Sequence, residues 1–293
     1  MSIEEGRQSN IARIIPSQTE RSAGALGNET VEYASRRFRS DGALIIEDIV
    51  DPALIAQARR VFGEAYSKYI DGGEHDDALR VGDRRLIITI NLEPPFDNPK
   101  LFANPYLLPV LEGALDDGLV IGAYGIVCSL ASAPEQHRHA DGGFLFPRSG
   151  IDRLLPASAI TVGIPLLEMN DVHGTTALWL GSHRDASRVP NEEGIKPVVK
   201  EGSCMLWDFR LSHGGTPNRS TLPRPLLFLT YCRPWFLDDL NYGKSNPKQK
   251  PLLVDKELWS SLSERHQRLL ARAHAGYAYR FDGFETSPGF RRG

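Results

Sequence analysis

The first third of the chain alternates apolar runs with polar stretches in a way that predicts a strand between helices. The run Ala43–Val50 is almost wholly apolar and predicts a strand. Directly after it, Asp51 and Pro52 are typical of a helix start, because a carboxylate accepts from free N–H groups and proline is tolerated in the first turn. The elements expected around this point are helices over 29–39 and 52–69, a strand over 86–91 and a short helix over 104–115.

From Leu119 onward the pattern changes to short apolar runs broken by Gly, Pro and Asn. The strands expected there are 119–130, 159–167, 177–180, 196–199, 203–209 and 226–232. Several strands without long helices between them favour an antiparallel sandwich or barrel. The stretch 255–274 then predicts a closing amphipathic helix, with Leu258, Leu262 and Leu269 near one face.

The order of these elements predicts an α+β fold that is mainly β, with helices first, a β core in the middle and a helix last. No Pro-, Gly- or Ser-rich linker divides the chain, so we expect a single domain over residues 1–293. Residues 1–25 are rich in Ser, Gly and charge, and we expect them to form a loose N-terminal arm.

Composition narrows the classes of protein. Of the 293 residues, 41% are hydrophobic and 24% charged, which is typical of a globular chain. The net charge of −3 and the lack of a basic run argue against a nucleic-acid partner. No apolar stretch is long enough to span a membrane. Three widely spaced cysteines without a CxxC pair, and a polar start without a signal peptide, indicate a cytoplasmic protein.

Candidate chemistry begins in the segment Gln136–Gly143. Side chains two residues apart on an extended chain point to the same face, so His139 and Asp141 can present an imidazole and a carboxylate to one point. His137 shares that face, and the pattern alone leaves a choice between the two histidines.

A third metal-binding side chain and a cation follow later. His213 comes after the strand expected over 203–209, just before Gly214-Gly215, which is expected to be a turn. Two imidazoles and one carboxylate are the ligand set of non-haem Fe(II) oxygenases, because they leave positions open for a cosubstrate and O₂. Arg224 follows eleven residues later, and a guanidinium binds a carboxylate with two hydrogen bonds. The cosubstrate 2-oxoglutarate needs both a metal and a cation.

These motifs occur in a recognisable order. Gln-x-x-His-x-Asp from Gln136, Asn-Asp-x-x-x-Gly-Thr-Thr from Asn170, Gly-Ser-His from Gly181, Asp-x-Arg-x-x-His-Gly-Gly-x-x-Asn-x-Ser from Asp208, and Arg224 together resemble the phytanoyl-CoA dioxygenase family. The resemblance implies a double-stranded β-helix, a jelly-roll or cupin-like fold, flanked by N-terminal helices and a C-terminal helix. It also implies an Fe(II)- and 2-oxoglutarate-dependent oxygenase.

The resemblance also assigns residues. It implies that His139, Asp141 and His213 ligate iron and that Arg224 binds the distal carboxylate of 2-oxoglutarate. Further hydrogen bonds to the cosubstrate are expected from Gln136 and from Thr176 or Thr175. The implied reaction uses O₂, releases succinate and CO₂, and hydroxylates, desaturates or cyclises a small organic molecule, as in secondary metabolism. Because Asp141 is present, hydroxylation is favoured over halogenation.

Residues that line the substrate pocket are expected nearby. The candidates are Phe144 and Phe146 after the glycine pair, Trp235 after the last strand, and Arg84 or Arg85 before the strand at 86–91. A homodimer is also considered. Two other classes of protein stay open at this point: a cupin-like metalloenzyme with non-oxidative chemistry, and a non-catalytic β-barrel binding protein.

Overall fold

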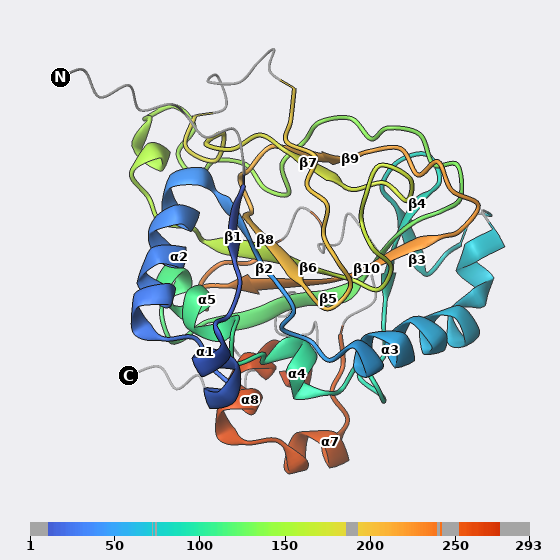
Figure 1. Cartoon of the computed structure of the whole chain (residues 1–293), viewed down its shortest axis with the longest axis horizontal. Coiled ribbons are helices and arrows are strands. Elements are labelled where there is room, and N and C mark those ends of the chain that lie inside the picture. Colours follow the sequence, from blue (N-terminus) through green and yellow to red (C-terminus); the bar gives the residue numbers. More distant parts are fainter. Residues whose placement is uncertain are drawn as a thin grey trace.

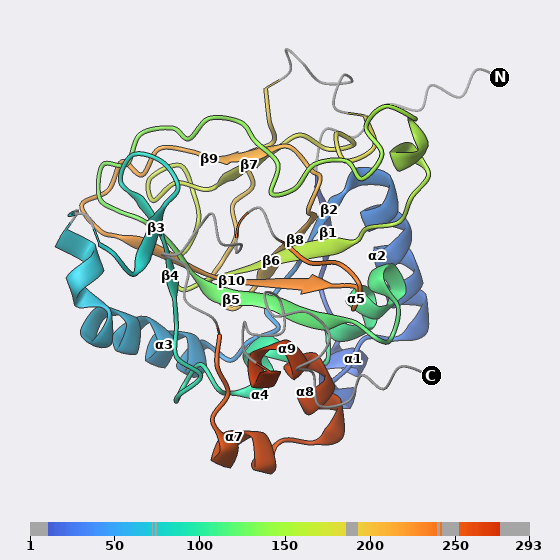
Figure 2. The ribbon, with the colours of Figure 1, turned by 180° about the vertical axis from the view of Figure 1, so that it is seen from behind.

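A large twisted sheet forms the centre of the computed structural model, which describes residues 11–71, 73, 75–185, 193–238, 241 and 252–275. A small two-stranded sheet lies over one face of the large sheet (Figure 1). Helices cover the opposite face and one end, and the view from behind shows the same division (Figure 2). The space between the two sheets is therefore the place where a site can form.

The large sheet has eight strands. In spatial order they are β1 (Ala12–Ile14), β2 (Ala43–Ile46), β8 (Cys204–Asp208), β6 (Ala159–Pro165), β10 (Arg224–Cys232), β5 (Val120–Ser129), β4 (Arg85–Thr89) and β3 (Ala78–Arg80). The small sheet pairs β7 (Thr176–Leu178) with β9 (His213–Gly215). All pairings are antiparallel except that of β1 with β2. The predicted mainly β core is confirmed.

The two faces of the large sheet have different roles, and β10 illustrates the difference. Leu227, Leu229 and Tyr231 point into the main core beneath the helices. Leu226 and Phe228 alternate with them and belong to smaller clusters on the inner face, toward β7 and β9. Because successive side chains of a strand point to opposite faces, a strand buried on both sides reads in sequence as one continuous apolar run.

Helices supply the other side of the main core. Their bounds are α1 (Gln18–Ala23), α2 (Asn28–Asp41), α3 (Pro52–Ala65), α4 (Pro99–Phe102), α5 (Leu108–Leu115), α7 (Lys256–Ser261), α8 (Glu264–Leu269) and α9 (Ala271–Ala275), with 3₁₀ turns η1 (Ser67–Asp71) and η2 (Ile151–Arg153). The predicted start of α3 is confirmed, because the Asp51 side chain accepts from the N–H of Ala53 at 2.7 Å. None of the described helices is long and apolar enough to cross a membrane.

The N-terminal segment is more ordered than expected. Residues 11–25 are not a loose arm: β1 adds to the sheet beside β2, and α1 begins at Ser17 with a capping box that Glu20 completes. Apolar Ile14 is almost fully buried in the core, which ties the segment to the sheet. Residues 1–10 lie outside the described part of the chain.

The prediction of one continuous helix over 255–274 is wrong. The stretch forms three helices, α7, α8 and α9. The break between α7 and α8 lies at Leu262, which has an extended backbone, and the Ser263 side chain then caps α8 by accepting from the N–H of His266. A capping serine competes with helix continuation, since its side chain replaces an intrahelical partner.

Two expectations about strands also change. The stretch 196–199 forms no strand: Val199 makes an isolated bridge to Met169, and Ile195, just before the stretch, makes one to Leu178. Conversely, Gly214-Gly215 is not a turn but part of β9, paired with β7. The glycines are needed there because a Cβ on Gly214 would lie 3.2 Å from two backbone carbonyl oxygens of the neighbouring segment, those of Gln136 and His137.

Candidate metal centre

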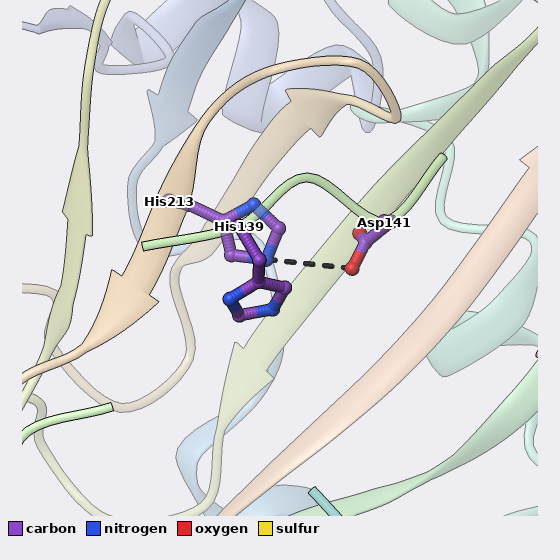
Figure 3. A group of neighbouring side chains, drawn as sticks. All are labelled: His139, Asp141 and His213. Carbon is purple, nitrogen blue, oxygen red and sulfur yellow. Dashed lines mark ion pairs between the residues drawn. The ribbon is translucent and has the colours of Figure 1, made fainter. Parts of the chain in front are cut away.

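The proposed ligands come from two segments that run side by side between the sheets. The N–H of His139 donates to the carbonyl of His213 at 2.9 Å, and the N–H of His213 donates to the carbonyl of His139 at 2.7 Å. This antiparallel bridge brings together residues that are distant in sequence. Figure 3 shows the two imidazole rings close together, with the Asp141 carboxylate directed at His213.

The three side chains form a group that can hold one ion. One donor atom from each of His139, Asp141 and His213 lies within 4.8 Å of the others, and Nε2 of His213 is 3.4 Å from Oδ1 of Asp141. Two ligands of one metal ion are at most about 4.2 Å apart when each bond is about 2.1 Å, so small side-chain movements complete the site. Two imidazoles and one carboxylate suit a first-row transition metal such as iron.

Hydrogen bonds orient both histidines in the same way. Nδ1 of His139 lies 3.0 Å from the carbonyl oxygen of His137, and Nδ1 of His213 lies 2.9 Å from that of Leu211. A carbonyl oxygen only accepts, so each Nδ1 carries the hydrogen. The lone pair is then on Nε2, which is the atom required for metal binding.

The charges of the group also favour a cation. Burial lowers the pKa of His139, and the nearby His213 lowers it further. Burial alone would raise the pKa of Asp141, but the charge of His213 and hydrogen bonds from His213 and Thr161 bring it below its usual value. Burial would lower the pKa of His213, but Asp141 raises it above its usual value. The pair therefore favours a positive charge between Nε2 and the carboxylate, and a metal ion that binds there takes the place of a proton.

The geometry favours His139 over His137 as the metal-binding histidine of the first segment. His137 is exposed and does not belong to the group of three donors. Its ring centroid is 5.3 Å from that of His139, whereas the rings of His139 and His213 are 4.4 Å apart. His137 lines the cavity beside the group.

A cavity of about 400 Å³ adjoins the three donors and extends to a row of polar side chains on the inner face of the large sheet. Arg85 of β4 and Arg224 of β10 both pair with Ser129 of β5, one from each side. The two arginines are each 2% exposed and both line the cavity. Arg224, predicted from the sequence, thus lies beside a second guanidinium.

Two nitrogens of each guanidinium group lack a hydrogen-bond partner among the described residues. Nε and Nη1 of Arg224, Nε and Nη1 of Arg85, and Oγ of Ser129 are buried without a hydrogen bond to any described residue. Burial, followed by repulsion from Arg85, lowers the pKa of Arg224 to about 10. Burial also lowers the pKa of Arg85. Buried polar groups are nearly always hydrogen-bonded, so the unused donors of this row have the chemistry to hold an anion.

The other predicted cosubstrate contacts divide into two groups. Gln136 and Thr176 line the cavity. The Gln136 amide is already engaged, since it donates to the carbonyl of Val81 and accepts from the N–H of Gly215. Thr175 is not at the cavity: it is buried on the other side of the strand, and its hydroxyl donates to the carbonyl of Pro197 at 2.6 Å.

The three aromatic candidates for the pocket, Phe144, Phe146 and Trp235, do not line the cavity. Phe146 is 54% exposed, and Phe144 is half-buried outside the cavity. Their segment is held by the Asp152 carboxylate, which accepts from the N–H groups of Leu145 and Phe146. Trp235 is 63% exposed, packs edge-to-face against Phe236 and does not line the cavity.

The prediction that Arg84 lines the pocket is also wrong, because Arg84 is not among the residues around the cavity. It is exposed, has a positive φ of 53°, and its side chain donates to the carbonyl of Ala131. Arg85 takes the expected place. Strand alternation contained a signal for this choice, because Leu86 and Ile88 point to the main core and Arg85 shares the opposite face with Ile87.

Two aromatic residues of the cavity were not singled out as functional. Trp207 and Phe209 both line it. The Phe209 ring lies against Gly142, whose Cβ would be 2.5 Å from it, and so fixes the segment that carries Asp141. Period-two alternation places Trp207 on the inner face with Met205, but contact with the metal-binding group depends on the tertiary structure.

Fold and donor set together define a non-haem metal enzyme of the cupin-like class. More narrowly, the chain belongs to the phytanoyl-CoA dioxygenase family, because the family model "Phytanoyl-CoA dioxygenase (PhyH)" matches residues 38–226, well over half of its length. The predicted Fe(II)/2-oxoglutarate-dependent oxygenase is confirmed at this general level. The predicted cofactors, Fe(II), 2-oxoglutarate and O₂, are those of this family.

Solved structures share the fold at low sequence identity. The non-haem α-ketoglutarate-dependent epimerase SnoN from nogalamycin biosynthesis is 18% identical, with a TM-score of 0.51 over 71% of this chain and 84% of SnoN. The non-haem monooxygenase ThoJ, solved as a nickel complex, is 17% identical, with a TM-score of 0.52 over 69% of this chain and 78% of ThoJ. SnoN has also been solved with Fe³⁺, α-ketoglutarate and nogalamycin RO. The predicted jelly-roll fold is thus confirmed.

Proposed function

We propose that this protein uses iron and 2-oxoglutarate to oxidise a small organic molecule, by hydroxylation or by the related desaturation or cyclisation. The observation that carries the proposal is the pairing of two features in one cavity. The His139–Asp141–His213 donor group lines the cavity, and so do two buried arginines that each have two nitrogens without a partner among the described residues.

The arginine row accounts for binding of the cosubstrate. A carboxylate can accept about four hydrogen bonds, one at each lone pair. Unused donors lie side by side on the adjacent strands β10, β5 and β4, where they belong to Arg224, Ser129 and Arg85. The distal carboxylate of 2-oxoglutarate neutralises part of this buried positive charge. Arg85 is held in place because its Nη2 donates to the carbonyl of Thr216 at 2.8 Å, on the segment that follows His213.

The donor group accounts for binding of the metal. When bound by Nε2 of both histidines and by Asp141, ferrous iron couples oxidation of the substrate by O₂ to conversion of 2-oxoglutarate into succinate and CO₂. The protein's part is to aim Nε2 of both imidazoles at the metal through their Nδ1–H bonds and to keep Asp141 ionised.

The inner face of the sheet supports an organic substrate with an apolar part. Ile87 and Val127 are only half-buried, and together with Phe228 they present an apolar surface to the cavity. Burying that surface under a ligand is favourable by about 25 cal/mol per Å². The description of SnoN as an enzyme of nogalamycin biosynthesis agrees with a role in secondary metabolism.

The proposal is tested by anaerobic titration of the Fe(II)-loaded protein with 2-oxoglutarate, followed by visible absorption. We expect a metal-to-ligand charge-transfer band that is lost in Asp141→Ala and His213→Ala and kept in His137→Ala, the matched control from the same segment. Candidate compounds are then screened by mass spectrometry for gain of oxygen or loss of two hydrogens, with succinate measured in parallel. Absence of the band in the wild-type protein would overturn the proposal, and turnover without 2-oxoglutarate would favour non-oxidative metal chemistry.

A further inference from the structure

The carboxylate of Asp141 is held asymmetrically. Its Oδ2 accepts two hydrogen bonds, one from the Thr161 hydroxyl at 2.8 Å and one from the indole N–H of Trp207 at 3.1 Å. Its Oδ1 is the atom that faces Nε2 of His213. The two oxygens therefore have different partners: Oδ2 is bound to the large sheet, and Oδ1 is directed at the metal-binding group.

The two donors belong to fully buried strands of the large sheet. Thr161 of β6 and Trp207 of β8 are cross-strand partners in the large sheet. Each is 5% exposed, and all residues of both strands are buried. Neither strand carries one of the three metal-binding side chains. Thr161 and Trp207 therefore hold the Asp141 carboxylate from outside the metal-binding group.

Trp207 touches a second member of the group. The centroid of its ring is 5.3 Å from that of His213, with an angle of 51° between the planes. The indole therefore binds the carboxylate through its N–H and packs against an imidazole through its face. A phenyl ring in its place would keep the second contact and lose the first.

We propose that Trp207 and Thr161 are positioning residues that make Asp141 bind the metal through Oδ1 alone. A carboxylate that turned to offer both oxygens would give up two hydrogen bonds and would occupy a further metal position. Because the proposed chemistry needs three open positions on the metal, binding through one oxygen is what leaves room for the cosubstrate and O₂. The inference rests on the proposed function, but it concerns metal binding and is testable without turnover.

The experiment measures binding of Co(II) to the metal-free protein by calorimetry and visible absorption. The variants are Trp207→Phe, which keeps the ring and removes the N–H, and Thr161→Val, which keeps the shape and removes the hydroxyl. We expect each to weaken Co(II) binding about tenfold to 100-fold, as is usual for outer partners of metal ligands, and to shift the Co(II) absorption band. Thr161→Ser retains the hydroxyl and is expected to restore affinity to within about threefold of wild type.

Matched controls separate positioning from packing. Thr230→Val removes a buried hydroxyl from β10, where Thr230 is the cross-strand neighbour of Thr161. Trp179→Phe changes the tryptophan directly after β7. Both variants are expected to bind Co(II) like the wild type. Melting temperatures of the metal-free proteins show whether any variant is misfolded.

The outcomes distinguish the inference from the proposed function. If Trp207→Phe and Thr161→Val bind Co(II) as tightly as the wild type and with the same spectrum, the positioning role is overturned while the metal site stands. If the controls lose as much affinity as the two variants, the effect is one of packing and the inference is likewise overturned. A wild-type protein that binds no Co(II) overturns the proposed function, and the inference with it.

Discussion

A Cβ atom on Gly215 would lie 2.8 Å from Nε of Arg85. The same atom would lie 3.2 Å from Oε1 of Gln136. The residue two positions after His213 thus has to be a glycine for Arg85 to reach the cavity beside Arg224. The strand that delivers a metal-binding imidazole also makes room for the anion-binding guanidinium.

The first prediction follows from this contact. Gly215→Ala displaces the Arg85 side chain, because a methyl carbon is not tolerated closer than 3.0 Å to another heavy atom in a packed interior. We expect 2-oxoglutarate affinity to fall about tenfold, with Co(II) affinity changed by less than about threefold. Calorimetric titration of both ligands checks this, and Gly143→Ala is the control, since its new Cβ meets nothing within 4 Å. Equal losses for metal and cosubstrate would contradict the prediction.

A second prediction separates stability from binding at Arg224. Its buried nitrogens lack partners and it lies beside another cation, so Arg224→Met removes an uncompensated charge. We expect the ligand-free protein to gain about 1 kcal/mol in free energy of unfolding, a rise of roughly 2–4 °C in Tm. Affinity for 2-oxoglutarate should fall about 100-fold, because a buried charge-assisted contact is lost.

Thermal melts with and without 2-oxoglutarate measure both effects of Arg224→Met. Arg219→Met is the control, since Arg219 is exposed and donates to the backbone of Asp171. A variant that is less stable in the absence of ligand, yet binds 2-oxoglutarate like the wild type, would show that Arg224 serves the fold and not the cosubstrate.

A third prediction concerns the thiols. Cys128, Cys204 and Cys232 are all buried, and burial raises the pKa of Cys128 and of Cys204 to about 12. Because the thiolate is the reactive form, we expect the native protein to resist iodoacetamide near neutral pH. Mass spectrometry should find three modified cysteines only after unfolding in guanidinium chloride. Rapid labelling of Cys128 or Cys204 in the native protein would contradict the buried placement of its strand.

A fourth prediction uses the capping box of α1. Hydrogen bonds from the Thr30 side chain, the N–H of Gly27 and Ser17 lower the pKa of Glu20 from 4.5 to about 2. A carboxyl group whose pKa is lower in the folded state stabilises the protein above the unfolded pKa, and this stabilisation is lost as the pH falls toward the folded value. We expect Glu20→Gln to cost less than about 1 kcal/mol at pH 7, because the group is close to solvent.

The difference between wild type and Glu20→Gln should narrow steadily below pH 4.5, as measured by urea unfolding at a series of pH values. Glu29→Gln removes a carboxylate from the next helix and serves as the control for a general effect of charge. A difference that stays constant down to pH 3 would show that Glu20 is not ionised through these hydrogen bonds.

Local patterns in the sequence determined much of the fold. The start of α3 at Asp51 and Pro52 depends on groups within one turn of each other, and the end of α2 at Gly42 depends on a backbone conformation that glycine adopts freely. Errors occurred where a distant partner decides the conformation. Gly214-Gly215 has the composition of a turn, but pairing with β7 makes it a strand.

In the candidate site, too, some features follow from the sequence and others depend on residues that are distant in the chain. The pattern of residues left His137 and His139 open, and the resemblance to the family selected His139, Asp141, His213 and Arg224. Only the tertiary structure brought three of these donors together, distinguished Arg85 from Arg84, and placed Trp207 and Thr161 against Asp141. Those contacts join strands far apart in the chain, and their distances are set by how the sheet packs, which no local pattern of residues records.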